Sequence, residues 1–316
     1  MRRVPIVCLS IASRCVTSIC VRCICVTCIC VTCLAMAAEN PETIALWPPA
    51  ALAAKGYTGE ETNIPSANKV DGRPFNQLSN VVNPRMTIYR PADGKANGVA
   101  VLVFPGGSYR ILADDMEGSE VCQWLNSIGV TAMLVRYRVP PLPGKERYAA
   151  PLEDAQRAIG IVRSHAADWH LDEKRIGVLG FSAGGHLAAT VSNNFDARTY
   201  QPVDKSDAVS CRPDFTILIY PAFMNDRTAP VGQLTPEIHI TAHTPPAFLV
   251  QTEDDPVRVQ NSLYYYLALV EVKVPAEMHL FSNGGHGYGL RATGAPVAAW
   301  PKYAEEWLKT TGLIAR

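Results

Sequence analysis

The chain has 316 residues, and its 29 Lys and Arg balance its 29 Asp and Glu, so the formal net charge is zero. A neutral chain disfavours nucleic acid or a polyanionic membrane surface as the partner. Hydrophobic residues make up 48% and charged residues 18%, a composition that supports a large core and argues against intrinsic disorder.

The first 38 residues differ from the remainder. They contain four arginines, no acidic residue and eight of the ten cysteines, so that 25 basic groups face 29 acidic ones in the rest of the chain. The arginines near the start, the apolar run 24–34 and the small residues Ala35 and Ala37 are typical of a secretory signal peptide. We therefore predict cleavage near Ala38 and a secreted or periplasmic protein without stable membrane insertion.

Three other interpretations of residues 1–38 remain open: an incorrectly assigned start, a lipid or membrane anchor, and a cysteine-rich metal module. The sequence VRCIC at 21–25 recurs almost unchanged as VTCIC at 26–30, which is low complexity without the separated ligand pairs of a structural zinc site. The apolar run is shorter than the roughly 20 residues of a membrane span. The remaining Cys122 and Cys211 form either one disulfide or, as we favour, two small buried apolar residues.

Residues 39–85 are rich in Pro, Asn and Gly and lack sustained periodicity, which predicts an extended arm packed on the next domain. Short apolar runs then alternate with amphipathic stretches through residues 86–316. The predicted strands are 86–89, 99–104, 132–136, 175–179, 216–220, 247–251 and 277–281, and the predicted helices are 117–128, 151–169, 183–191, 257–270 and 297–309. This order indicates one α/β domain with a mostly parallel sheet, helices on both faces and a site at the carboxyl ends of the strands.

The segment Gly180-Phe181-Ser182-Ala183-Gly184 directly follows one predicted strand and begins a predicted helix. This is the context of a nucleophile elbow, in which a sharp turn holds Ser182 in a strained conformation and small neighbours relieve the crowding. The alternative is that Ser182 merely caps the helix. We favour the elbow and expect the Ala183 N–H to face a developing oxyanion.

A second glycine-rich turn, Pro105-Gly106-Gly107-Ser108, follows the predicted strand 99–104. Its backbone N–H groups are suited to bind a carbonyl oxygen, so Gly106 and Gly107 are expected to complete an oxyanion hole with Ala183. An ordinary glycine turn is the alternative.

A serine nucleophile needs a base and an acid, which follow it in the order Ser, acid, His in this architecture. We predict His286 as the base because it lies in a glycine-rich loop just past the last strand, whereas His279 lies within that strand. His186, four residues after Ser182, is expected to be a packing residue. Of the carboxylates after the strand 247–251 we favour Asp254 as the acid over Asp255, because Asp255 precedes Pro256 and is suited to cap the next helix.

Five segments in the same order, PGGSY (105–109), LVRYR (134–138), GFSAGGHL (180–187), TPP (244–246) and GGHG (284–287), resemble bacterial secreted α/β-hydrolase esterases of the acetyl xylan esterase and feruloyl-esterase-like type, related to the hormone-sensitive-lipase-like group. The resemblance runs from about residue 42 to 310 and implies an α/β-hydrolase fold. It implies Ser182 as nucleophile, His286 as base, Asp254 as acid, and the amides of Gly106, Gly107 and Ala183 as oxyanion donors. Ser108 stands where many relatives have a third glycine.

The resemblance implies hydrolysis of acetyl or other short acyl esters of plant polysaccharides such as xylan. A general carboxylesterase, a lipase-like enzyme or a small peptidase would share the same catalytic residues, and a non-catalytic binding module is the alternative of another class. We expect no metal or other cofactor, and a small-molecule or polysaccharide ester as the partner. Ser108, Tyr109 and Tyr288 are expected to line the site, with core packing as the alternative for the tyrosines, and Glu117 to order the loop above it. The short, proline-rich segment 221–246 predicts a rim and no large lid.

Overall fold

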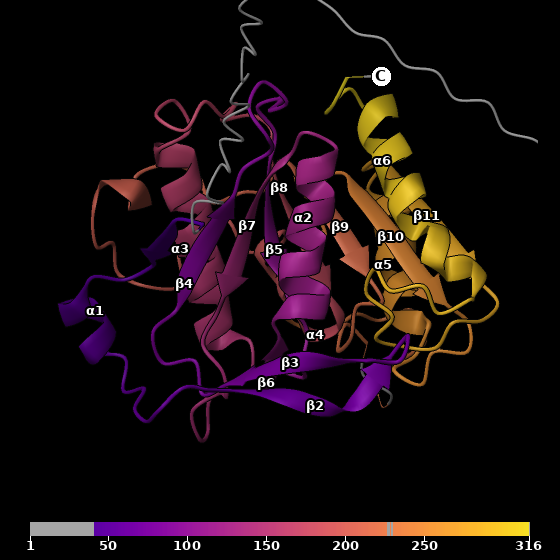
Figure 1. Cartoon of the computed structure of the whole chain (residues 1–316), viewed down its shortest axis with the longest axis horizontal. Coiled ribbons are helices and arrows are strands. Elements are labelled where there is room, and N and C mark those ends of the chain that lie inside the picture. Colours follow the sequence, from indigo (N-terminus) through magenta and orange to yellow (C-terminus); the bar gives the residue numbers. More distant parts are fainter. Residues whose placement is uncertain (1–40, 226–227, 229, 316) are drawn as a thin grey trace, which may run out of the picture. The chain divides into compact units, whose positions relative to one another are not determined.

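The computed structural model describes residues 41–225, 228 and 230–315, so the predicted signal peptide at 1–38 lies outside the described residues. Residues 41–316 form one compact unit around an eight-stranded sheet (Figure 1). The strands, in spatial order, are β1 (Thr43–Ala45), β4 (Arg85–Tyr89), β7 (Thr131–Arg136), β5 (Ala100–Phe104), β8 (Ile176–Phe181), β9 (Phe215–Ile219), β10 (Ala247–Thr252) and β11 (Ala276–Phe281). The pairs β1–β4 and β4–β7 are antiparallel, and every later pair is parallel.

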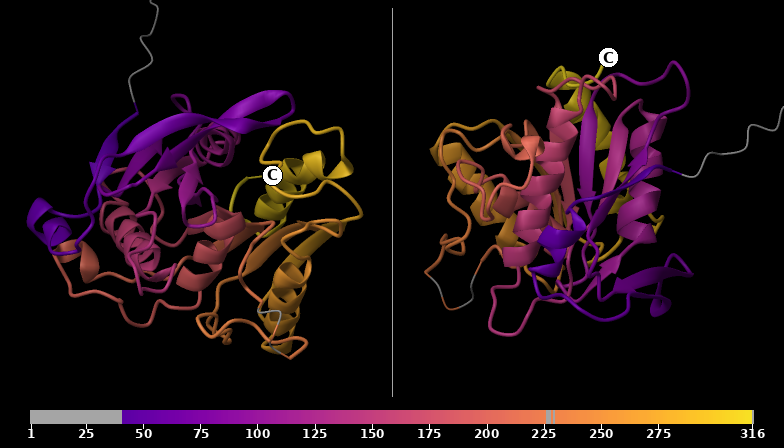
Figure 2. Two further views of the ribbon diagram at one scale, coloured as in Figure 1. Left: turned by 90° about the horizontal axis from the view of Figure 1, so that it is seen from below. Right: turned by 90° about the vertical axis from the view of Figure 1, so that its left-hand side faces the viewer.

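Helices cover both faces of this sheet (Figure 2). They are α1 (Pro49–Ala53), α2 (Glu120–Ser127), α3 (Ala149–Ser164), α4 (Ser182–Val191), α5 (Gln260–Glu271) and α6 (Trp300–Thr310). Successive residues of β5 point to opposite faces: Leu102 joins the apolar core beneath α3, α4 and α5, whereas Val101 and Val103 join the core beneath α2 and α6. The predicted α/β-hydrolase architecture is therefore confirmed.

A second, three-stranded sheet is formed by β2 (Thr62–Val70), β3 (Arg73–Ser79) and β6 (Ile111–Ala113). It lies across the carboxyl ends of the parallel strands (Figure 1). All of β2 and β3 comes from the segment that we expected to be an extended arm, and β1 from the same segment extends the main sheet. The sequence did not predict β2 because its side chains are exposed apart from Ser66 and partly buried Val70, so the alternation of a half-buried strand is missing.

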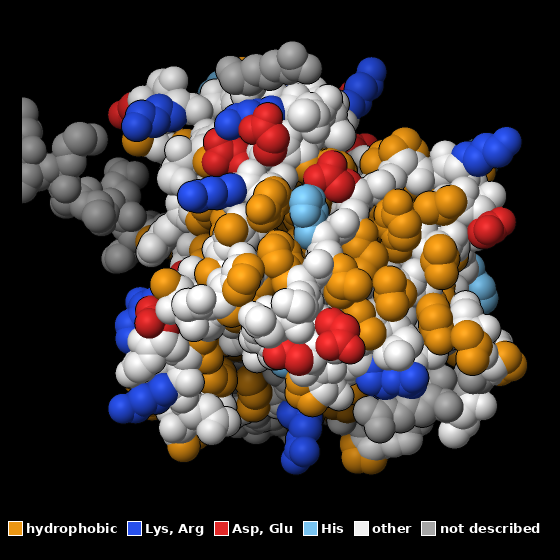
Figure 3. Space-filling view, turned by 90° about the vertical axis from the view of Figure 1, so that its right-hand side faces the viewer, with side chains coloured by type: hydrophobic (Ala, Val, Ile, Leu, Met, Phe, Trp, Pro, Cys, Tyr) orange, Lys and Arg blue, Asp and Glu red, His pale blue; other side chains and the backbone are white. Residues whose placement is uncertain are grey.

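The two cysteines of the described chain, Cys122 and Cys211, are buried and free, which agrees with the interpretation as small core residues. Among the described residues no helix is long and apolar enough to cross a membrane. Between β9 and β10 the described residues form turns, with no helix or strand and no large lid. On the face that carries β11, apolar side chains gather at the surface (Figure 3), and the large exposed ones on β11, α5 and α6 are Leu267, Val270, Leu280 and Tyr303.

Candidate active site

Ser182 lies at the junction of β8 and α4, where the chain turns sharply. Phe181 is extended, and Ser182 adopts a positive φ of 50°, a conformation that is strained for a residue with a side chain. The close packing explains the flanking glycines: a Cβ on Gly180 would collide with the Gly184 carbonyl, and a Cβ on Gly184 would collide with the Phe104 carbonyl at the end of β5. The predicted elbow geometry at Ser182 is therefore confirmed.

His286 connects Ser182 to a buried carboxylate. Its Nε2 lies 2.8 Å from Ser182 Oγ, and its Nδ1 lies 2.7 Å from Asp255 Oδ2. Because an ionised carboxylate only accepts hydrogen bonds, the proton belongs on Nδ1 and leaves Nε2 free to accept from the serine. The histidine loop and the loop after β10 thus bring together a serine, an imidazole and an aspartate.

The aspartate in contact with the imidazole is Asp255, so our choice of Asp254 was wrong. Asp255 Oδ1 accepts from the Val257 N–H at 2.7 Å in the turn before α5, and Oδ2 faces His286 and also accepts from Gln251 Nε2 at 2.7 Å. The helix-capping role that we expected for Asp255 is also wrong, because α5 begins at Gln260 and has no side-chain cap. Gln251 is held in turn by Ser262. The Asp255 carboxylate therefore holds the turn before α5 with one oxygen and the imidazole with the other.

Asp254 instead supports the loop that carries the imidazole. Its side chain points to solvent, and its carboxylate accepts from the N–H groups of Gly284 and Gly285 at 3.2 and 2.8 Å. The backbone hydrogen bond from Gly285, with a second from Gly284, lowers the pKa of this exposed carboxyl. Thr252 fixes the same loop by donating to the Gly285 carbonyl at 2.7 Å.

The predicted oxyanion hole needs one correction. The Gly106 N–H donates to Glu117 Oε2 at 2.6 Å, so this amide is occupied and is not available to a substrate. The Gly107 N–H makes no hydrogen bond within the described part of the chain. The Ala183 N–H lies in the first turn of α4, where no intrahelical acceptor exists, so Gly107 and Ala183 remain as the two donors.

Glu117 joins three segments around the site. It lies in the π-helical turn Asp115–Ser119 before α2, an irregularity that is frequent at functional sites. Its second oxygen accepts from the Tyr220 hydroxyl at 2.8 Å, and that hydroxyl accepts from the Gly289 N–H at 3.0 Å. Burial raises the pKa of Glu117, although the hydrogen bonds from Tyr220 and Gly106 and the nearby His286 oppose the shift. We expected Glu117 to order a loop, but no local sequence pattern indicates Tyr220 as its partner.

Ser182 and His286 open onto a cavity of about 500 Å³. Exposed Ser108 lines it, as predicted, together with Gly107 and Glu117. The predictions for Tyr109 and Tyr288 were wrong, because both rings are buried in the core. The Tyr288 ring packs edge-on against Tyr220, and its hydroxyl has no partner among the described residues.

Tyr109 holds His186, which is the packing residue that we predicted. Its hydroxyl lies 2.8 Å from His186 Nδ1, and His186 Nε2 lies 2.9 Å from Glu237 Oε1. Complete burial lowers the pKa of His186, although Glu237 opposes this shift. A neutral imidazole that accepts from the tyrosine and donates to the carboxylate satisfies both contacts.

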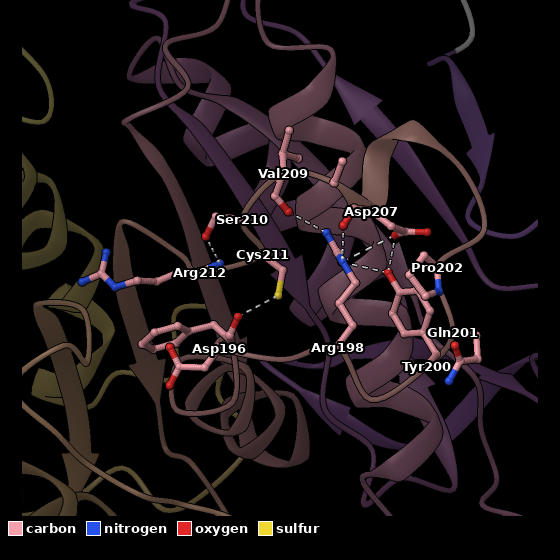
Figure 4. Close-up of a pocket in the computed structure, with 12 residues that line it drawn as sticks. Asp196, Arg198, Tyr200, Gln201, Pro202, Asp207, Val209, Ser210, Cys211 and Arg212 are labelled. Carbon is pink, nitrogen blue, oxygen red and sulfur yellow. Dashed lines mark hydrogen bonds and ion pairs between the residues drawn. The ribbon is translucent and has the colours of Figure 1, made fainter.

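A second hollow, of about 700 Å³, is lined by residues between 195 and 212 (Figure 4) and not by Ser182. Two of its charged side chains are engaged within the protein: Arg198 donates to the carbonyls of Asp207 and Val209, and the Tyr200 hydroxyl donates to the Asp207 carboxylate. No group of three or more His, Cys, Asp or Glu among the described residues is placed to hold a metal ion.

Comparison with known proteins agrees with this fold. A sequence model of the BD-FAE family matches residues 86–217. An acetyl ester-xyloside bifunctional hydrolase from Caldicellulosiruptor lactoaceticus has a similar structure, with a TM-score of 0.66 and 34% identity over 87% of this chain and 98% of the other. Fold and site together define an α/β hydrolase with a serine nucleophile elbow.

Two curated relatives extend the comparison. An acetylxylan esterase of Xylanibacter ruminicola is 30% identical over 72% of this chain and 49% of its own length. Carboxylesterase NlhH of Mycobacterium tuberculosis is 25% identical over 67% of this chain and 73% of its own. This chain thus spans about half the length of the first relative. The chain belongs to the α/β-hydrolase esterases, in the acetyl xylan esterase and feruloyl-esterase-like group related to the hormone-sensitive lipases, as the sequence predicted.

Proposed function

We propose that the protein is a serine esterase that removes short acyl groups, above all O-acetyl groups, from plant polysaccharides such as xylan. The observation that carries the proposal is the hydrogen-bonded series of Asp255, His286 and Ser182, with distances of 2.7 and 2.8 Å. A serine hydroxyl is a poor nucleophile alone, and an adjacent imidazole oriented by a carboxylate is what activates it.

In the first half of the reaction, Ser182 Oγ attacks the ester carbonyl while His286 Nε2 takes its proton. Asp255 stabilises the imidazolium that forms, because its carboxylate accepts from the Nδ1–H. The N–H groups of Gly107 and Ala183 donate to the oxyanion, and each donor of this kind contributes roughly 10²- to 10³-fold to the rate. His286 then protonates the alcohol, which leaves.

In the second half, a water molecule replaces the alcohol. His286 takes a proton from the water as its oxygen attacks the acyl carbonyl, and the same two amides receive the second oxyanion. The proton then passes from His286 to Ser182 Oγ, and the carboxylic acid leaves. These steps use only side chains, backbone amides and water.

Two observations support an acetylated polysaccharide as the substrate. The named activities of two similar proteins, acetylxylan esterase and acetyl ester-xyloside hydrolase, concern acetyl esters on xylan-related substrates. The site also opens without a large lid, which suits a polymer better than a long-chain lipid. The similarity to carboxylesterase NlhH favours a general carboxylesterase as the second candidate.

The experiment measures acetate release from acetylated xylan beside the hydrolysis of p-nitrophenyl acetate, p-nitrophenyl butyrate and a feruloyl ester. The full chain is compared with Ser182→Ala and with Ser127→Ala, an exposed serine at the end of α2. We expect release from xylan that is lost only in Ser182→Ala. Activity confined to the synthetic esters would leave the serine esterase and remove the polysaccharide. Full activity of Ser182→Ala would refute both.

We also propose that the protein acts outside the cytoplasm, because residues 1–38 have the charge and apolar pattern of a secretory signal. Expression in a bacterium, followed by separation of the cell fractions, tests this proposal. We expect the protein outside the cytoplasm with an amino terminus near residue 38 or 39. A cytoplasmic protein that keeps all 38 residues would contradict it.

A further inference from the structure

The active-site cavity has a wall that the catalytic chemistry does not use. Four residues of the β2–β3 hairpin line it beside Ser182 and His286: Asn68, Lys69, Val70 and Phe75. A cavity of about 500 Å³ falls within the range of sites that enclose whole small molecules and is far larger than an acetyl group requires. The hairpin therefore lies where the part of the substrate beyond the acyl group must go.

Phe75 is the unusual side chain of this wall. Its ring is only partly buried, belongs to neither apolar core, and makes no ring contact among the described residues. By contrast, Tyr109 and Phe223 near the same site pack on each other. A large aromatic ring that the core does not use, and that lines a cavity beside a nucleophile, is available to a ligand.

The backbone on both sides of Phe75 is firmly anchored. The buried guanidinium of Arg291 donates to the carbonyls of Arg73 and Pro74 at 2.9 and 2.8 Å and pairs with Glu120 at 2.8 Å. On the other side, the Asn76 N–H donates to Asp115 Oδ1 at 2.8 Å. The ring is thus preorganised, which lowers the entropic cost of binding.

Arg291 also ties this wall to the catalytic loop, because it follows His286 by only five residues. The guanidinium that holds Arg73 and Pro74 therefore fixes the hairpin relative to the segment that carries the imidazole. The distance between the aromatic ring and the reacting ester is set by this contact, so a substrate that touches both must have a defined spacing.

Two polar side chains complete the wall. Asn68 and Lys69 are exposed on β2, and Lys69 forms no ion pair within the described residues. An amide and an ammonium supply donors for hydroxyl groups, whereas an aromatic face with its negative potential attracts the C–H groups of a sugar ring. This combination recognises a pyranose better than a long acyl chain.

We propose that the β2–β3 hairpin forms a sugar-binding subsite, in which Phe75 stacks on the pyranose that carries the ester and Asn68 and Lys69 bind its free hydroxyls. This inference rests on the proposed polysaccharide esterase and names the group that recognises the alcohol side of its substrate. Methyl acetate bypasses the subsite, because its alcohol side is a single methyl group and its reaction needs only Ser182, His286 and the oxyanion donors.

The test compares Phe75→Ala with the full chain on acetylated xylotriose and on methyl acetate. We expect kcat/KM for the saccharide to fall by roughly 2- to 13-fold, the value of one aromatic contact, mainly through KM. Activity on methyl acetate should stay within about twofold, and Phe75→Tyr should restore the saccharide activity. Ile64→Ala is the control, since Ile64 is exposed on β2 of the same hairpin and lies outside the cavity; this variant should change neither activity.

Equal losses on both substrates would mean that Phe75 only supports the fold, and no loss on either would mean that it binds nothing; both results overturn the inference. If the full chain releases no acetate from the saccharide, the proposed substrate fails, and calorimetry with unacetylated xylotetraose decides the subsite separately. Binding that Phe75→Ala weakens supports the subsite, whereas absent or unchanged binding refutes it.

Discussion

Replacing Asp255 by Asn tests the assignment of the catalytic acid. Both carboxylate oxygens accept hydrogen bonds, Oδ1 from Val257 and Oδ2 from His286 and Gln251. Asparagine has one acceptor oxygen, so either the Val257 contact is lost or an NH₂ group faces the imidazole and forces the wrong tautomer. For a triad imidazole in this state kcat falls by roughly 10⁴-fold, which equals about 5 kcal/mol of transition-state stabilisation.

Asp254→Asn is the matched control. Its amide oxygen still accepts from the Gly285 N–H, and the site is exposed to water, which weakens such contacts. We expect less than about a fivefold loss. Initial rates on p-nitrophenyl acetate give kcat and KM for both variants, and thermal unfolding verifies that both are folded. A large loss in Asp254→Asn together with an active Asp255→Asn would refute the reasoning.

Three further predictions concern residues around the site. Glu117→Gln should lower kcat by roughly 10- to 100-fold with little change in KM, because one amide cannot accept from both donors that bind this carboxylate; unchanged kinetics would contradict this. Burial holds the pKa of His186 below its usual 6.5, so the unfolded chain binds more protons and the free energy of unfolding should fall as pH drops through about 6.5. Urea unfolding at pH 5 to 8 should show this slope, and His186→Gln should reduce it. Gly184→Ala should lower the free energy of unfolding by about 1 to 3 kcal/mol, because the added Cβ overlaps the Phe104 carbonyl. An unchanged melting temperature would refute the crowding argument.

The nucleophile and base were predictable because their evidence is local. The serine lies between glycines at a strand-to-helix turn, and the histidine lies in a glycine-rich loop after the last strand. These local contexts suffice to predict where each side chain lies in the fold. The positive φ of Ser182 and the 2.8 Å contact with His286 agree with that evidence.

The choice between adjacent aspartates was not predictable in this way. It depends on which carboxylate turns inward after β10, and we assigned Asp255 to a helix cap because it precedes Pro256. In the fold Asp255 does not cap α5; one of its oxygens accepts from Val257 in the turn before the helix, and the other faces the imidazole. Gly106 failed as an oxyanion donor for a similar reason, because a carboxylate 11 residues later in the chain binds its amide.

The β2–β3 hairpin escaped sequence analysis for a different reason. A strand is recognised by a buried face, and β2 buries only Ser66, with Val70 partly buried. Its order comes from backbone pairing with β3, while Arg291, more than 200 residues away in sequence, anchors β3. Contacts of this range leave no local pattern.

The acyl-enzyme is the species that most directly tests whether Ser182 is the nucleophile. The full chain is mixed with p-nitrophenyl acetate, quenched in acid during the burst and digested for mass spectrometry. We predict one acetyl group per chain, on the peptide that contains Ser182, and none in Ser182→Ala. Turnover at the full rate with no acetyl group on that peptide, or with the acetyl group on another residue, would contradict the proposed mechanism.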